Sequence, residues 1–196
     1  MHKPFSESCE QNKHVILDVL QKELIHQKNL LEIGSGTGQH AIFFAEKLPH
    51  LHWQCSDRLP ELAGINAWLN DSLLPNLPAP IELDVMSSQW PNKKYDAIFS
   101  ANAVHIMPWL AVEAMFSGIH QCIADEATVC LYGPFNYDGK FTSESNARFD
   151  QWLKQRDPLS GIRDFEALNA LAEQGGLTLK NDYEMPANNR ILCWSK

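Results

Sequence analysis

The chain has 196 residues, 44% of them hydrophobic and 20% charged, a size and balance that suit one folded domain with a full hydrophobic core. Its formal net charge of −8 argues against a broad surface for nucleic acids or anionic membranes, because like charges repel. The five cysteines are scattered and form no C-x-x-C pair, which indicates reduced thiols in a cytoplasmic protein. We expect no metal site, no signal peptide in residues 1–5 and no association with a membrane.

The first expected element is a helix that begins with a capping box at Ser8 and Gln11. An apolar stripe follows at Ile16, Leu20 and Leu24, every fourth residue, so this helix can cover one face of a sheet.

A glycine-rich turn follows the first expected strand, residues 30–33. Gly34, Gly36 and Gly38 alternate as G-x-G-x-G and lead into a second helix. Such a turn brings the backbone close to a ligand, because glycine has no Cβ, and it is typical of nucleotide sites. The dinucleotide fingerprint G-x-G-x-x-G fails, because position 39 is Gln.

Glu32 lies at the carboxyl end of the same strand, two residues before the first glycine. A carboxylate there would repel a pyrophosphate seated on the helix N-terminus, but it suits a ligand that carries an ammonium and a sulfonium. The run resembles motif I of class I methyltransferases that use S-adenosylmethionine (SAM), E/D-x-G-x-G-x-G. A purely structural turn between strand and helix is the alternative.

Two more acidic residues lie at the ends of the next two expected strands. Asp57 follows the strand at 51–56, where an acid can accept hydrogen bonds from both ribose hydroxyls in NAD and SAM folds alike. The strand at 81–85 contains Asp84 and Val85. The resemblance implies that Asp84 accepts a hydrogen bond from the adenine amino group.

Strands and helices continue to alternate to the end of the chain. We expect helix 60–69, strand 95–100, helix 108–123, strand 128–132, a helix at about 145–155, helix 165–173 and strands 177–179 and 191–194. The polar and aromatic segment 135–163 is long for a connection, which favours a substrate-side insertion or lid. The pattern predicts one α/β domain over residues 1–196.

This layout resembles the Rossmann-like fold of class I methyltransferases. The resemblance implies a seven-stranded, mostly parallel sheet with an antiparallel last strand and helices on both faces. In such sheets ligands bind beyond the carboxyl ends of the strands. The candidate cofactor residues are Glu32, Gly34, Ser35, Gly36, Gly38, Asp57, Asp84, Val85 and Asn102, with Asn12 and Lys13 closing over the methionine end.

A narrower resemblance covers nearly the whole chain. The sequence is similar to the methyltransferase-like 26 proteins and their bacterial relatives at residues 12–13, 34–38, 53–57, 102–109, 132–135, 145–150, 156–158, 161–164 and 186–189. Gln11, Cys55 and the pair Asp125-Glu126 depart from that pattern. The resemblance implies a small SAM-dependent methyltransferase and names no substrate.

Methyl transfer from SAM is an in-line displacement, so the protein has to align the acceptor and, for a weakly acidic acceptor, remove a proton. His105, just beyond the fourth strand, is the candidate base, because its unperturbed pKa lies near neutrality. A structural hydrogen bond at the start of a helix is the alternative role. Residues 102–105 lack the (Asn/Asp)-Pro-Pro-(Tyr/Phe) motif of enzymes that methylate exocyclic amines or amide nitrogen, which disfavours such acceptors.

Four polar residues in or near expected loops are candidates for substrate binding: Tyr132, Arg163, Asn188 and Asn189. The two asparagines could instead be turn residues that tolerate a left-handed backbone, and Arg163 could form a surface ion pair.

The main hypothesis is therefore a cytoplasmic SAM-dependent methyltransferase that releases S-adenosylhomocysteine (SAH). The acidic balance and the segment 135–163 favour a small-molecule acceptor over a protein or nucleic acid. Two other functions stay open: a non-catalytic SAM-binding partner or sensor and, less favoured, an NAD(P)-dependent oxidoreductase.

Overall fold

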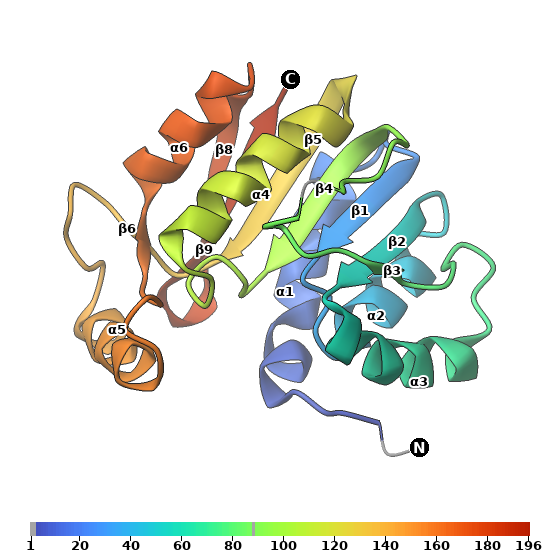
Figure 1. Cartoon of the computed structure of the whole chain (residues 1–196), viewed down its shortest axis with the longest axis horizontal. Coiled ribbons are helices and arrows are strands. Elements are labelled where there is room, and N and C mark those ends of the chain that lie inside the picture. The colour runs from blue at the N-terminus through green and yellow to red at the C-terminus, as the bar shows by residue number, and fades with distance from the viewer. Residues whose placement is uncertain (1–2, 88) are drawn as a thin grey trace.

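The computed structural model describes residues 3–87 and 89–196, and their strands form one seven-stranded sheet with helices on both faces (Figure 1). Met1 and His2, part of the segment without a signal-peptide pattern, lie outside the described residues. The strands of this sheet are β1 (Asn29–Ile33), β2 (His52–Asp57), β3 (Ile81–Glu82), β4 (Tyr95–Ala101), β5 (Ile123–Gly133), β8 (Thr178–Met185) and β9 (Asn189–Ser195).

The order of the strands across the sheet is β3-β2-β1-β4-β5-β9-β8. Every pairing from β3 to β5 is parallel, whereas β9 is antiparallel to both β5 and β8. The predicted sheet, mostly parallel with an antiparallel last strand, is therefore confirmed. The direction of winding changes between β1 and β4, which makes the carboxyl ends of these strands the expected place for a ligand.

The described part of the chain forms six α-helices. They are α1 (Glu7–Glu23), α2 (Gln39–Lys47), α3 (Leu62–Ser72), α4 (Trp109–Cys122), α5 (Glu144–Arg156) and α6 (Phe165–Gln174), with short 3₁₀ turns η1 (Leu59–Glu61) and η2 (Pro186–Asn188). In Figure 1, α4 and α6 cover one face and α1, α2 and α3 the other, while α5 stands apart from both layers. The expected helix at about 145–155 is thus confirmed as α5.

Alternation along β1 divides the core between the two faces. Leu31 and Ile33 pack towards α4 and α6, whereas Leu30 packs towards α1, α2 and α3. On the second face the rings of Phe44 and Trp53 lie 5.5 Å apart. Because Glu32 shares the parity of Leu30, its side chain falls on the face that holds Trp53.

Several element boundaries differ from the expected ones. The capping box is wrong: α1 begins at Glu7, and Ser6 is its N-cap without a side-chain hydrogen bond. The third strand ends at Glu82, because Asp84 starts a turn in which its Oδ1 accepts from the Met86 N–H at 2.9 Å. A separate parallel pair, β6 (Phe135–Asn136) and β7 (Arg163–Asp164), was not expected.

No helix in residues 3–87 or 89–196 is both long enough and apolar enough to cross a membrane.

Replacing Phe44 by Ala removes a fully buried ring and leaves a cavity beside Trp53 and Phe99. We expect the free energy of unfolding to fall by about 3–5 kcal/mol, the usual cost of truncating a buried phenylalanine. Urea denaturation followed by circular dichroism measures the loss. The matched control is Leu110→Ala on α4, whose side chain is 68% exposed and should cost less than about 0.5 kcal/mol. Equal losses would contradict the packing described here.

Candidate functional site

The three glycines of the turn after β1 all adopt positive φ: 74° at Gly34, 57° at Gly36 and 87° at Gly38. A Cβ on Gly34 would lie 3.3 Å from the Ala103 Cβ, and a Cβ on Gly38 would lie 3.3 Å from Ile65. A Cβ on Gly36 would meet nothing within 4 Å. The fold itself therefore crowds the outer two glycines, whereas the middle one borders open space that a ligand can approach.

Backbone hydrogen bonds join this turn to the end of β2. The Ser56 carbonyl accepts from the N–H groups of Gly34 and Ser35, each at 3.0 Å. The Gly36 N–H donates to Asp57 Oδ2 at 2.8 Å, and the Arg58 N–H donates to Asp57 Oδ1 at 2.8 Å. The Asp57 carboxylate is thus held beside the turn, and each oxygen keeps a further lone pair for a hydroxyl donor.

Glu32 supports the turn from beneath. Its side chain is only 2% exposed, and its Oε2 accepts from the Trp53 indole N–H at 3.0 Å and from the Ser35 hydroxyl at 2.8 Å. Burial raises the pKa of this carboxyl to about 7, and the negative charge of Asp57 adds to the effect. Near neutral pH the group can therefore gain or lose a proton without leaving its hydrogen bonds.

The next strand ends bring further candidates to the same edge. The Leu83 N–H donates to the Asp57 carbonyl at 2.9 Å, and the exposed Asp84 follows, two residues beyond the register of Asp57 with Glu82. Val85 is buried under α4. Asn102, with φ of 56°, follows β4, and its N–H donates to the Tyr132 carbonyl at 2.9 Å.

The first helix is tied to the start of α2. Asn12 Oδ1 lies 2.7 Å from His40 Nε2, and Glu10 pairs with Lys13 while accepting from Gln39 Nε2 at 2.9 Å. Burial lowers the pKa of His40 to about 4, so its ring is neutral near pH 7. Asn12 and Lys13, expected to close over the methionine end, therefore already have partners within the protein.

His105 lies in the loop between β4 and α4 and is 4% exposed. Its Nδ1 is buried without a hydrogen-bond partner and lies 3.5 Å from where a Cβ on Gly133 would be. The edge of the imidazole meets the Phe149 ring, with the centroids 5.4 Å apart. Burial and, to a smaller extent, the positive charge of Arg163 lower the pKa of His105 to about 4. This pKa lies below the unperturbed value from which His105 was chosen as the candidate base.

The four substrate candidates divide into two pairs. Tyr132 is buried on β5, and burial raises the pKa of its hydroxyl, an effect that the adjacent Asn12 and Asn189 partly oppose. Asn189 itself begins β9 and donates to the Pro186 carbonyl at 3.2 Å. These residues link α1 to the turn between β8 and β9.

Arg163 and Asn188 have structural partners. The guanidinium of Arg163 donates to backbone carbonyls, so the alternative of a surface ion pair is wrong. Asn188, with φ of 57°, has the left-handed turn conformation allowed for it, and its carbonyl accepts from Asn146 Nδ2 at 3.0 Å.

Sequence reasoning missed the residues that support this edge. Trp53 was assigned only to a strand, and the carboxylate that its indole N–H binds could not be inferred from spacing. Asn146 and Asp150 are buried polar residues on α5, a helix whose exposed residues are mostly polar too. Their spacing of four residues on one helix face was the available signal, since a buried polar pair needs partners.

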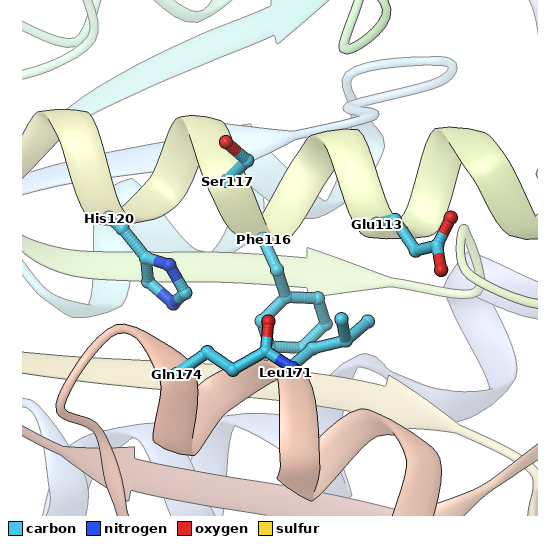
Figure 2. Close-up of a pocket in the computed structure, with 6 residues that line it drawn as sticks. All are labelled: Glu113, Phe116, Ser117, His120, Leu171 and Gln174. Atoms are coloured by element: carbon cyan, nitrogen blue, oxygen red, sulfur yellow. The ribbon is translucent and has the colours of Figure 1, made fainter.

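A hollow of about 440 Å³ lies between α4 and α6, away from this edge (Figure 2). Its lining residues are Glu113, Phe116, Ser117, His120, Leu171 and Gln174. None of the candidate site residues lines it, so the hollow is not part of the candidate site. In the described part of the chain, no group of three or more metal-ligating side chains gathers to hold an ion.

Solved structures of class I methyltransferases share this fold. An O-methyltransferase family protein from Burkholderia thailandensis superposes with a TM-score of 0.84 at 10% identity, covering 97% of this chain and 57% of that chain. The apo form of the S-adenosylmethionine-dependent methyltransferase SibL gives a TM-score of 0.81 at 16% identity, covering 96% of this chain and 55% of that chain. A structure of PigF with SAH gives 0.79 at 14% identity, covering 95% and 56%.

The chain therefore spans little more than half the length of these solved proteins. At such identities the likeness shows the fold alone. A family model described as "Protein of unknown function (DUF938)" matches residues 3–196.

The raised pKa of Glu32 gives a prediction about stability and pH. Between pH 4.5 and about 7 the folded chain binds a proton that the unfolded chain releases, so this group's contribution to stability falls as pH rises through that window. We expect the free energy of unfolding of wild type, minus that of Glu32→Gln, to fall by roughly 3 kcal/mol from pH 5 to pH 8. Denaturation across this range measures it, with Glu46→Gln on the exposed side of α2 as control. A difference that stays constant with pH would contradict the assignment.

Proposed function

The chain belongs to the DUF938 family of proteins of unknown function, and we propose that it is a SAM-dependent methyltransferase acting on a small-molecule acceptor. The observation that carries this proposal is the open space beside Gly36. The Asp57 carboxylate borders this space, and Glu32 binds the Ser35 hydroxyl in the same turn. The narrower similarity to the methyltransferase-like 26 proteins is part of the same proposal.

The residues at this edge fit SAM by their chemistry. Asp57 offers acceptor oxygens to the two ribose hydroxyls, and the exposed Asp84 offers one to the adenine amino group. Glu32, ionised, favours the positive charges of the methionine end. The same acids would repel a pyrophosphate, so a dinucleotide fits less well. When bound, SAM supplies an electrophilic methyl group on a sulfonium sulfur.

On the acceptor side, the chain has to orient a nucleophile and receive its proton. His105 is neutral near pH 7, which is the form that accepts a proton, and its buried Nδ1 lacks a partner within the protein. Tyr132, Asn188 and Asn189 lie on the neighbouring β5 and the turn into β9. We assign these residues to substrate binding and His105 to proton removal.

The acidic chain and the segment 135–163 beside His105 support a small acceptor over a macromolecule. The free thiols at all five cysteines support the cytoplasm as the place of action. Several neighbours in fold are O-methyltransferases by name, which makes a hydroxyl the first acceptor group to test.

Cofactor binding is tested by calorimetric titration of SAH into wild type and Asp57→Ala. We expect the wild type to bind and the variant to lose roughly 1.5–3 kcal/mol of binding free energy, because hydrogen bonds to a charged group are removed. Asp71→Ala, an exposed acid on α3 that pairs with Lys3, is the matched control and should bind normally. No heat of binding to wild type at millimolar SAH would rule out the proposal.

Turnover is tested with His105→Ala and a panel of hydroxyl, thiol and amine acceptors, measured as SAH release. We expect SAH affinity to be unchanged and kcat to fall by roughly 10²–10⁴-fold, the usual contribution of a general base. As the pH is lowered, kcat/KM of the wild type should decrease near pH 4, not near 6.5, because the His105 ring stays neutral down to about pH 4. Full activity in His105→Ala would show that His105 is not the base. Binding without turnover by the wild type would favour a SAM sensor instead.

A further inference from the structure

We propose that Arg163 is a positioning residue for His105, acting through a bracket formed by residues 159–163 that fixes the loop 104–107. The inference rests on the proposed function for its catalytic consequence only. The arrangement itself consists of hydrogen bonds between residues 159–163 and residues 104–107, which lie more than fifty residues apart in the chain.

The guanidinium of Arg163 joins the bracket to both ends of the loop. Its Nε donates to the Val104 carbonyl at 3.2 Å, and its Nη2 donates to the Met107 carbonyl. The same Nη2 donates to the Leu159 carbonyl at 2.8 Å, at the start of the bracket. A planar fork of donors can serve three carbonyls in fixed directions, which an ammonium group cannot do.

The two carbonyls between these ends are bound by the rest of the bracket. The Gly161 N–H donates to the His105 carbonyl at 2.9 Å, and the Ser160 hydroxyl donates to the Ile106 carbonyl at 2.7 Å. Four successive carbonyls of the loop therefore accept from the bracket. The backbone on both sides of His105 is held, which fixes the Cα–Cβ bond from which its imidazole extends.

The bracket is in turn anchored to α5. Asp150 is 3% exposed; its Oδ1 accepts from the Ile162 N–H at 2.9 Å, and its Oδ2 pairs with Lys154 at 2.6 Å. Gly161 has φ of 156°, and a Cβ there would lie 2.9 Å from Asp150 Oδ1. The bracket thus connects α5 to the loop that carries His105, instead of lying free over the site.

Arg163 also acts on His105 through its charge. Its guanidinium lowers the pKa of the imidazole in addition to the effect of burial. Burial lowers the pKa of Arg163 itself, an effect that the nearby Asp150 carboxylate partly opposes, and Lys154 pairs with Asp150. The residue that holds the backbone of His105 therefore also lowers the pKa of its imidazole, in the same direction as burial.

The test compares Arg163→Met, which removes charge and fork, with Arg163→Lys, which keeps the charge alone. NMR titration of the histidine rings in the folded chain follows His105 directly and needs no activity. We expect the pKa of His105 to rise in Arg163→Met and to lie between that value and wild type in Arg163→Lys. Arg148→Met is the matched control: Arg148 is an exposed residue of α5, paired with Glu144, and its loss should leave His105 unchanged.

Kinetics give the second measurement. We expect kcat to fall about a hundredfold in Arg163→Met, since small displacements of a catalytic group have effects of this size, with KM for SAM unchanged. Ser160→Ala removes one hydrogen bond of the bracket and should give a smaller fall in kcat, so it tests the inference if Arg163→Met does not fold.

A folded Arg163→Met in which His105 titrates as in wild type would overturn the inference, and so would wild-type kcat in both Ser160→Ala and Arg163→Lys. These outcomes are distinct from a failure of the proposed function. A chain that never transfers a methyl group can still show the expected shift in the His105 titration. An active chain can show no shift.

Discussion

The candidate site depends on one buried carboxylate at the end of β1. Burying an ionisable group is costly unless it is hydrogen-bonded, and Glu32 meets this requirement with the Trp53 indole on β2 and the Ser35 hydroxyl in the turn. The Ser56 hydroxyl completes the junction by donating to the Glu32 carbonyl at 2.6 Å. The glycine turn is therefore held by its neighbours on two strands, and Asp57 is delivered beside Gly36 as a consequence.

The part of the edge proposed to bind the methyl donor (the donor half) and the part proposed to bind the methyl acceptor (the acceptor half) are built in different ways. The donor half comes from a strand, a turn and the end of the adjacent strand, which parallel pairing brings side by side. The acceptor half is assembled from three distant segments, 104–107, 159–163 and 186–189. Hydrogen bonds to backbone carbonyls join them: Arg163 holds the first two, and Asn146 of α5 holds the third. Its geometry therefore depends on α5 as much as on the sheet.

The strand, turn and helix around the glycines were predicted well from the sequence, because the relevant signals are local. The glycines, Glu32 and the acid that ends the second strand follow from spacing along short stretches. The strand pattern predicted the α/β class, and the resemblance to class I methyltransferases implied the sheet with its antiparallel last strand. The acceptor half was harder, because its partners lie far apart in the chain. Nothing near Arg163 in the sequence shows that its guanidinium binds carbonyls of residues 104 and 107. The neighbours of the buried His105 ring include Phe149 and Gly133, which also lie far from it in the chain.

The central claim is that the space beside Gly36 receives the methyl donor. A crystal structure of the chain with SAH bound tests it most directly. The account predicts both ribose hydroxyls on the Asp57 carboxylate, the adenine beside Asp84 and the sulfur facing the loop that carries His105. SAH bound elsewhere, for example in the hollow between α4 and α6, with the space beside Gly36 left empty, would contradict it.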